Sequence, residues 1–411
     1  MKFARFNLVW TVVLASILAF CALLNYFVDP YSVFGSTRVQ GLNAQKAKAS
    51  SYTPLVKAYQ IERTSPQTVL FGTSRVDIGL DPSHSAWPQG SRPVYNYALP
   101  EASILTMNQQ LQHALQAGPV RSLVVGLEFQ DFLRGQIDST REPDEVEQRF
   151  LSLAHARSDW RRLRQTALDS AAATLTLSGL LDTIGTLATQ NSTVAGDVSD
   201  SGLTSESPYA GLVRKDGHYD LFLQKDMGIV RARQQAARVL SKGLEREFVE
   251  LAYLRQLIDF CQLNGIDLHL FIPPYHAHYL EIVDATGLWG RFENWKRELA
   301  SLVGDYQKRQ QARLTLWDFA SYDEFTTEAV PAKGDRKTSM QWFWEPVHFK
   351  KALGDIIVAR MLGTDHREFG VELTTDSLED RLGAGRRGQL AYRQRLPKEA
   401  ADIAALVLAT K

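Results

Sequence analysis

Residues 68–75 read Thr-Val-Leu-Phe-Gly-Thr-Ser-Arg, a short apolar and β-branched run that ends at a glycine. A run of this kind, without alternating polar residues, is typical of a strand buried on both faces of a parallel sheet. Gly72 permits a sharp turn after the strand, and Ser74 follows the turn. The stretch therefore predicts a buried strand that presents a serine at its carboxyl end.

Four further runs have the same character, and segments with helical periodicity separate them. We expect strands at 68–71, 94–97, 122–127, 267–272 and 313–317, and helices at 102–116, 232–264, 289–311 and 350–362. Gly118 and Gly265 stand just before two of these strands, where glycines commonly end helices. The alternation predicts an α/β fold of three layers, with a mainly parallel sheet between helices.

The amino terminus differs from the rest of the chain. Residues 8–28 are apolar, with Lys2 and Arg5 before them and Asp29 as the first charge after them. As a helix rising about 1.5 Å per residue, the segment would span roughly 31 Å, the thickness of a bilayer core. The positive-inside rule predicts a cytoplasmic tail at 1–7, a single-pass anchor at 8–28, and a periplasmic or extracellular remainder. A cleaved signal peptide is the alternative.

The rest of the chain suggests one main domain with attachments. We expect a connector at 29–65, a domain at 66–365, and a tail at 366–411 whose apolar helix at 399–408 docks on the domain. Residues 134–228 break the rhythm of strands and helices, so we interpret them as an insertion or a lid. The 46 basic and 46 acidic residues balance, which argues against a nucleic-acid partner.

The second informative segment is residues 343–349, Phe-Trp-Glu-Pro-Val-His-Phe. A serine nucleophile needs a base, and the base needs a partner that fixes its tautomer. Ser74, His348 and Glu345 supply these roles if the fold brings them together. Asp318, near the end of the strand at 313–317, is the alternative carboxylate, although we favour Glu345. Each residue also has a structural interpretation, Ser74 as a helix cap and His348 as a core or surface histidine.

The segment after the strand at 267–272 offers residues for substrate contact. Strand ends in such sheets line the ligand crevice. The candidate substrate-binding residues are Arg75, Tyr275, His276, His278 and Trp344. A polar loop is the alternative for the two histidines, and a metal pair there lacks a third ligand. We therefore expect no metal and no cofactor.

The turn Gly72-Thr73-Ser74 and the later Glu345-x-x-His348 resemble motifs of the SGNH (GDSL-type) hydrolase superfamily. The resemblance covers about residues 66–363 and implies a flavodoxin-like strand order and acyl transfer through the serine. Thr73 replaces the aspartate that precedes the serine in the superfamily, and Glu345 replaces the aspartate of its triad.

The oxyanion hole departs further from the superfamily pattern. The segment Gly126-Leu-Glu128-Phe129 lacks the asparagine that donates to the oxyanion in the superfamily. We expect the N–H of Ser74 and the side chain of Asn96 to take this role.

The layout of one amino-terminal span followed by these motifs is similar to that of D-alanyl transfer proteins of teichoic acid synthesis and of exopolysaccharide O-acetylation proteins. The resemblance implies O-acetyl transfer to or from a cell-surface or exported glycan, by an acyltransferase or an esterase. A membrane-bound O-acyltransferase is the implied donor partner. The departures from the motifs favour one alternative, a non-catalytic protein that binds glycan or scaffolds an export complex.

Overall fold

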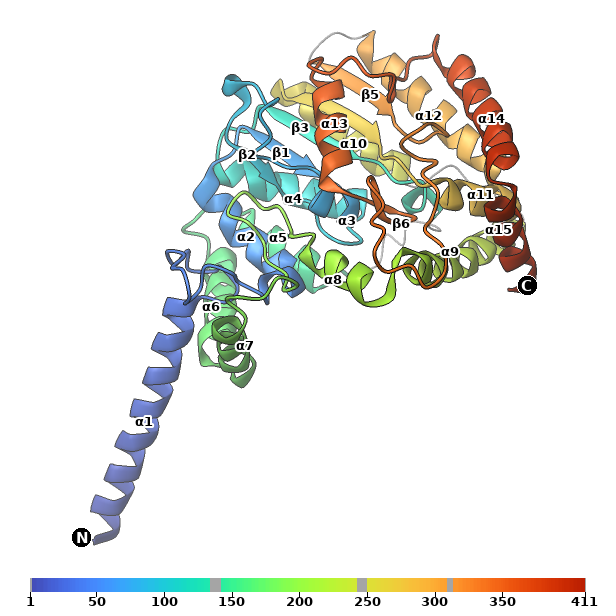
Figure 1. Cartoon of the computed structure of the whole chain (residues 1–411). Helices are drawn as coiled ribbons and strands as arrows, with labels where there is room; N and C mark the ends of the chain where they lie inside the picture. The colour runs from blue at the N-terminus through green and yellow to red at the C-terminus, as the bar shows by residue number, and fades with distance from the viewer. Residues whose placement is uncertain (1, 134–141, 242–249, 309–312, 411) are drawn as a thin grey trace. The chain divides into compact units, whose positions relative to one another are not determined.

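The computed structural model describes residues 2–133, 142–241, 250–308 and 313–410. The chain divides into two compact units. Unit 1 contains residues 1–65, 109–118 and 143–208, and unit 2 contains residues 66–108, 119–142 and 209–411. Figure 1 shows the elements of both units, including the amino-terminal helix and the sheet.

Unit 2 is built on a six-stranded, mainly parallel sheet. Its strands are β1 (Thr68–Phe71), β2 (Val94–Asn96), β3 (Ser122–Gly126), β4 (Asp267–Ile272), β5 (Leu314–Asp318) and β8 (Val371–Glu372). The order is β2-β1-β3-β4-β5-β8, and only β8 is antiparallel to its neighbour. The five parallel strands lie within one or two residues of the predicted bounds, in the flavodoxin-like order. No strand was predicted at β8, which is only two residues long.

Gly72 explains how the chain leaves β1. Every residue of β1 is buried, so the turn that follows the strand has little space between β1 and the next helix. A Cβ at Gly72, whose φ is +155°, would lie 2.3 Å from Cγ2 of Val76. A larger residue would therefore collide with the helix α3 (Ser74–Gly79) that begins two residues later.

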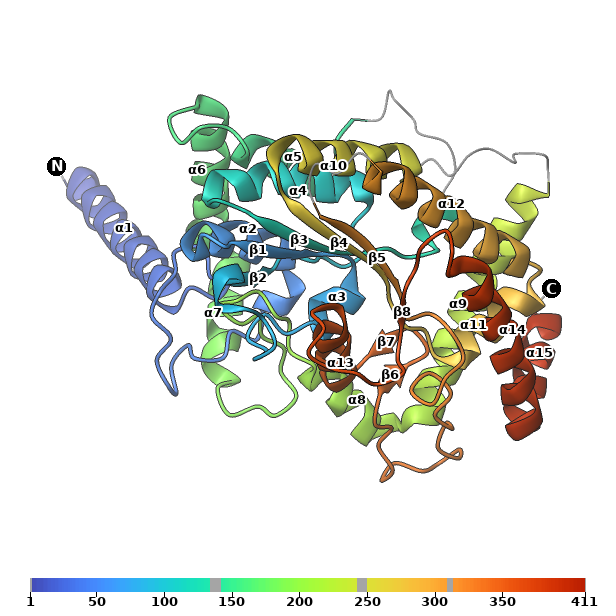
Figure 2. The same ribbon diagram turned by 90° about the horizontal axis from the view of Figure 1, so that it is seen from above.

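Helices lie on both faces of this sheet, as Figure 2 shows. One face carries α10 (Glu250–Asn264) and α12 (Trp289–Gln307), and the other carries α3 and α13 (Lys351–Met361). The helix predicted at 232–264 is two helices, α9 (His218–Leu240) and α10, with residues 242–249 outside the described part of the chain. The helix predicted at 289–311 is described as far as α12 extends, and residues 309–312 lie outside the description.

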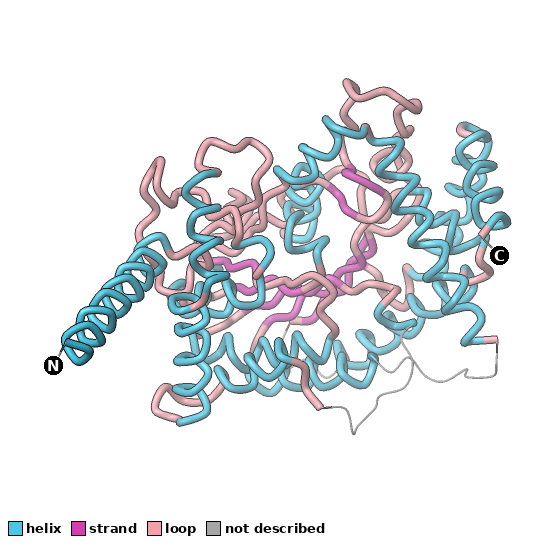
Figure 3. The backbone as a smooth tube through the Cα atoms, turned by 90° about the horizontal axis from the view of Figure 1, so that it is seen from below, coloured by secondary structure: helices cyan, strands magenta, loops and turns pink. Residues whose placement is uncertain are grey.

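Smaller elements complete unit 2. A second sheet is the hairpin of β6 (Phe343–Glu345) and β7 (His348–Phe349), drawn in magenta apart from the main sheet in Figure 3. The remaining helices that belong wholly or mainly to this unit are α8 (Ser207–Asp216), α11 (Ala277–Ala285), α14 (Leu378–Arg395) and α15 (Pro397–Ala409), while α4 (Ile104–Ala117) is divided between the units after residue 108. The terminal helix α15 packs on α11 and buries Ile403 and Val407.

Unit 1 is helical. Its elements are α1 (Lys2–Val28), α2 (Thr53–Thr64), α5 (Glu145–Leu153), α6 (Trp160–Leu175) and α7 (Leu177–Ala188). The segment predicted as a connector folds here, since Val56, Ala58 and Ile61 of α2 are fully buried. Part of the predicted insertion, residues 143–208, packs in the same unit. The segment 29–65 is therefore a structured part of unit 1.

The helix α1 has the properties expected of a membrane segment. An 18-residue window within residues 3–28 has a mean hydropathy of 2.3, and the helix is long enough to cross a bilayer. Their side chains are exposed as far as Phe20, and burial begins only near the carboxyl end of the helix. The chain is thus an α/β protein that carries one amino-terminal apolar helix, which suits a membrane anchor or a signal sequence.

Candidate active site

Ser74 and His348 meet although 274 positions separate them in the sequence. Ser74 is the first residue of α3, directly beyond the carboxyl end of β1, and His348 begins β7. Ser74 Oγ lies 2.7 Å from His348 Nε2, which is hydrogen-bonding distance. The serine is half-buried and the imidazole is buried, so the hydroxyl is the part of the pair that a substrate can reach.

Glu345 holds the other side of the imidazole. The β6–β7 hairpin pairs Glu345 with His348, and the Nδ1–H of His348 donates to Glu345 Oε1. The second carboxylate oxygen accepts the backbone N–H of Val347 at 3.1 Å. The hydrogen bond from His348 to Glu345 places the imidazole proton on Nδ1 and leaves Nε2 free to accept the serine proton.

The charges around the pair suit a neutral base beside a charged carboxylate. Burial raises the pKa of Glu345, but the adjacent His348 outweighs it, so the pKa lies below its usual value. Burial lowers the pKa of His348 and outweighs the opposing effect of Glu345. The imidazole is therefore neutral near pH 7, the form that can accept a proton.

Asp318, the alternative carboxylate, has other partners. Its oxygens accept hydrogen bonds from Lys296 Nζ at 2.8 Å and from Arg381 Nε at 3.0 Å. Burial raises its pKa, but the two cations outweigh burial and lower it. Asp318 is thus the centre of a buried ion cluster, and the carboxylate on His348 is Glu345.

Asn96 does not occupy the position expected of an oxyanion donor. Its side-chain amide donates to the carbonyl of Val76 at 2.7 Å and to that of Leu80 at 3.0 Å, while its oxygen accepts the N–H of Ala98. The residue is fully buried. Asn96 therefore holds α3 against β2. The N–H groups of Val76 and Asp77 donate to the carbonyl of Thr73, so the expected oxyanion donor that remains is the N–H of Ser74, the first residue of α3.

A second buried carboxylate, Glu128, lies behind the serine. It follows β3, the neighbour of β1 in the sheet, and accepts hydrogen bonds from the side chains of Thr73 and Arg75. Gln130 also donates to it, at 3.0 Å. No role was predicted for Glu128 from the sequence, where it lies in the segment that lacks the expected asparagine. Its position at the end of the neighbouring strand was the signal that could have identified it.

Arg75 and Tyr275 were predicted to bind substrate, but both lie in the protein interior. Both side chains are buried, and the Arg75 guanidinium lies 4.9 Å from the centroid of the Tyr275 ring. Arg75 Nε donates to the carbonyl of Val347 at 2.7 Å. These residues therefore support the site from behind, because their polar groups already have protein partners.

His276 and His278 are also internal. His276 is fully buried, bonds to the carbonyl of Glu328 at 2.7 Å, and has a pKa held well below its usual value by burial. His278 lies between Asp226 and Glu399, at 2.8 and 3.3 Å. Burial lowers the pKa of His278, but the two carboxylates outweigh it and raise the pKa to about 9. Within the described residues, no group of three or more His, Cys, Asp or Glu side chains is arranged to hold a metal ion.

Trp344 and Tyr209 cover the histidine. Their rings stack with centroids 6.1 Å apart, and the Tyr209 hydroxyl lies 3.4 Å from His348 Nδ1. Burial, with Glu345 and Asp77, raises the pKa of Tyr209, which keeps the phenol protonated. Trp344 was predicted to bind substrate, and its buried ring packs on Tyr209, a residue that was not predicted from the sequence.

The hairpin that carries Glu345 and His348 is fixed through its backbone. The N–H at Nδ1 of His218, in α9, donates to the carbonyl of Trp344 at 3.1 Å. The backbone N–H of His276 donates to the carbonyl of Pro346 at 3.0 Å. Together with the bond from Arg75 to Val347, three segments of the chain hold one short turn, which is the rigid support that a positioned base requires.

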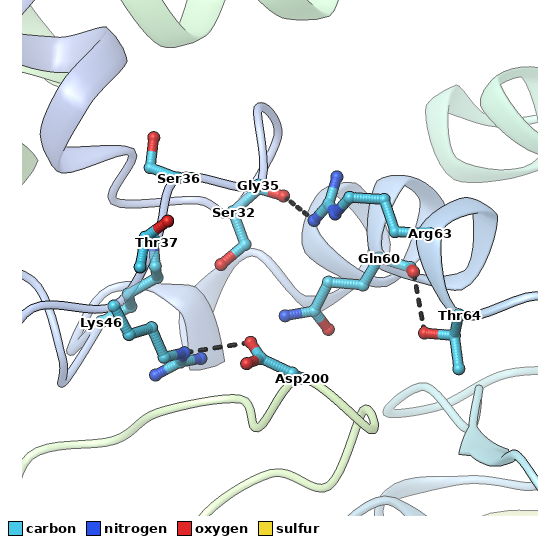
Figure 4. A pocket seen from close by; sticks show the side chains of 10 residues that line it. Ser32, Gly35, Ser36, Thr37, Lys46, Gln60, Arg63, Thr64 and Asp200 are labelled. Atoms are coloured by element: carbon cyan, nitrogen blue, oxygen red, sulfur yellow. Dashed lines mark hydrogen bonds and ion pairs between the residues drawn. The ribbon is translucent and has the colours of Figure 1, made fainter.

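Unit 1 contains a separate polar pocket of about 360 Å³, shown in Figure 4. Its wall includes Arg38, Arg63 and Asp200. The Arg38 Nε donates to Asp200 at 3.0 Å, and Arg63 donates to the carbonyl of Ser32 at 2.6 Å. The cationic side chains of the pocket are thus bound to protein groups, and none of the predicted site residues lines it.

Comparison with known proteins adds no relative. No model of a known protein family matches this chain, and no curated protein matches it. The assignment of function therefore rests on the geometry of the site.

Proposed function

We propose that this protein is an extracytoplasmic, serine-dependent acyltransferase or esterase of SGNH-like, three-layer architecture. The observation that carries the proposal is the chain of contacts from Ser74 Oγ to His348 Nε2, 2.7 Å apart, and from His348 Nδ1 to Glu345. Nucleophile, base and orienting carboxylate stand in the order that acyl transfer requires. The site lies where β1 and β3 end, and ligands of such sheets bind at strand ends.

The proposed reaction has two halves. Ser74 Oγ attacks the acyl carbonyl while His348 Nε2 takes the hydroxyl proton, and the N–H of Ser74 donates to the developing oxyanion. The leaving alcohol departs with the proton from His348, and an ester on Ser74 remains. Water or a sugar hydroxyl then gives its proton to His348 and attacks the ester carbonyl. The bond from the acyl carbon to Ser74 Oγ breaks, His348 returns the proton to Oγ, and the free acid or the acylated sugar leaves.

The acyl group proposed is O-acetyl, and the acceptor or donor is a cell-surface or exported glycan. The support is the resemblance of the Ser74 and Glu345-x-x-His348 motifs, together with the apolar helix α1. An anchor in the cytoplasmic membrane suits work beside a membrane-bound O-acyltransferase that supplies the acetyl group. A freely diffusing esterase would not require a membrane anchor.

A fluorophosphonate probe tests the nucleophile. The wild-type protein should form one phosphonyl adduct, because Ser74 Oγ displaces fluoride from phosphorus while His348 takes the proton. The adduct should map to the peptide that contains Ser74 and be absent from Ser74→Ala and His348→Ala. Ser85→Ala, which changes an exposed serine on the same segment, is the matched control and should label normally.

The second candidate function is glycan binding without turnover. It is favoured by the burial of Asn96, which removes the expected side-chain donor from the oxyanion position. Absence of the adduct in the wild type, or equal labelling of Ser74→Ala, would overturn the catalytic proposal. Retained binding of an exported glycan by Ser74→Ala and His348→Ala, with no turnover by the wild type, would then support the binding protein.

A further inference from the structure

The helical hairpin of α6 and α7 has an inverted distribution of polar and apolar residues. The buried residues of α7 are Gly179, Thr183 and Thr186. The large aliphatic residues are instead exposed. Leu175, at the end of α6, is 68% exposed, and Leu177, Leu181 and Ile184 of α7 are 71%, 58% and 51% exposed. A helix in water buries its aliphatic face, so this arrangement is that of a helix whose surroundings are apolar.

The polar groups of the hairpin turn toward the protein. Asp169 accepts hydrogen bonds from Tyr59 at 2.9 Å and from Arg149. Asp182 accepts one from Tyr31 at 2.7 Å. These are the only charged residues between Arg164 and Asp197, so no exposed charge interrupts the apolar surface of the corner where α6 meets α7.

The hairpin lies beside the carboxyl end of α1, within the same unit (Figure 1). Asn25 Nδ2 donates to the carbonyl of Thr174, at the corner, with a distance of 2.9 Å. Asn25 precedes the end of α1 by three residues, which places the corner roughly one helical turn, about 5 Å, inside the apolar segment. The exposed leucines of the corner therefore continue the apolar surface of α1.

The other end of α6 has the composition of a headgroup boundary. Trp160 is exposed at the start of the helix, and Arg157, Arg161 and Arg164 are exposed nearby. Tryptophan and arginine are favoured where hydrocarbon gives way to water and anionic headgroups. The hairpin thus changes along its length from a basic, aromatic end to an aliphatic corner.

We propose that the α6–α7 corner inserts into the same bilayer leaflet that the carboxyl end of α1 enters. Its exposed leucines contact lipid to a depth of about 5–10 Å, as amphipathic interfacial helices do. The inference goes beyond the acyl-transfer proposal and rests on the proposed anchoring of α1. Two membrane contacts on one unit restrict its rotation about α1, so unit 1 keeps a defined orientation on the membrane.

Lipid contact can be measured in the full-length protein reconstituted into vesicles of phosphatidylcholine and phosphatidylglycerol. Cys21→Ser and Cys261→Ala remove the native thiols, and an environment-sensitive fluorophore is placed at Leu177→Cys or Leu181→Cys. Ile17→Cys, in α1, is the reference for lipid, and Leu263→Cys, an exposed leucine of α10, is the reference for water. Doxyl-lipid and aqueous iodide serve as the two quenchers.

The labels at 177 and 181 should respond as the label at 17 does. Doxyl-lipid should quench them about twofold or more beyond its effect at 263, and iodide should quench them less. Quenching by iodide alone at 177 and 181, with the label at 17 in lipid, would overturn the inference and leave the anchor intact. Protection from both quenchers would also overturn it, because a second copy or another protein would then cover the corner. Iodide quenching at 17 as well would reject the anchor together with the inference.

Discussion

Arg75 Nε donates a hydrogen bond of 2.7 Å to the carbonyl of Val347, so the residue after the serine holds the residue before the histidine. The two segments that carry the proposed nucleophile and base are thus joined twice, once through the side chains of Ser74 and His348 and once through this buried bond. Glu128 completes the arrangement, because it binds the same guanidinium and also Thr73. The carboxylate of Glu128 therefore binds the residues on both sides of Ser74.

The two candidate carboxylates should give opposite phenotypes. In Glu345→Gln the amide oxygen keeps the N–H of Val347, so the NH2 group faces His348 Nδ1 and favours the wrong tautomer. We expect fluorophosphonate labelling and turnover to fall by about 10³–10⁴-fold with little change in stability. Asp318→Asn leaves Lys296 and Arg381 without a buried counter-charge. We expect it to lower the free energy of unfolding by about 3 kcal/mol while labelling persists in the folded protein. Labelling rates and urea unfolding of both variants separate these outcomes, and normal labelling of Glu345→Gln would contradict the assignment.

The labelling rate should rise with pH and reach its plateau at a relatively low pH. Only neutral His348 can take the serine proton, and burial holds the pKa of its imidazole below the usual 6.5. The rate should therefore exceed half of its plateau already at pH 6.5. Glu345→Gln should move the midpoint to lower pH, because the carboxylate acts to raise this pKa. A rate that still climbs steeply above about pH 7.5 would show that another group titrates.

The pair of Arg75 and Glu128 should show strong coupling in folding. Both side chains are almost fully buried, so Arg75→Met leaves a buried carboxylate without its cation and should cost about 3–5 kcal/mol of unfolding free energy. Combining it with Glu128→Gln removes the unpaired charge, and the double variant should be more stable than the sum of the single effects predicts by about 1–3 kcal/mol. Urea unfolding of the four proteins in this cycle measures the coupling. Additive effects would mean that the two groups do not depend on each other.

His278 should make stability depend on pH. Asp226 and Glu399 raise the pKa of His278 in the folded protein to about 9, above the usual 6.5. The stabilisation is therefore complete below pH 6.5 and disappears as the pH rises to about 9, and it amounts to at most about 3 kcal/mol. Thermal unfolding of the wild type and of His278→Gln should differ most at pH 6 and converge toward pH 9. A difference that is constant over this range would exclude titration of His278.

Local patterns predicted much of this protein because each depends on a short stretch of chain. The strands at 68–71 and 267–272 could be located to the residue, since a short, mostly apolar run ending in Gly or Pro has few alternatives. The helical pattern at 232–264 predicted parts of α9 and α10, but not that α9 begins as early as His218, and residues 242–249 lie outside the described part of the chain. The fold of residues 29–65 was missed because the burial of α2 comes from α5 and other parts of unit 1 that are distant in sequence.

The sequence by itself determined the apolar amino-terminal helix, the α/β alternation and the identities of Ser74 and His348 as a pair worth testing, because periodicity, length and residue chemistry are properties of neighbouring residues. Only the tertiary structure decided which carboxylate contacts His348. The tertiary structure also showed that the side chain of Asn96 bonds to backbone carbonyls, and that Glu128 lies behind the serine. Those assignments depend on which strand ends adjoin in the sheet. A buried polar group takes whichever partner the packed chain brings within hydrogen-bonding distance, whatever its place in the sequence.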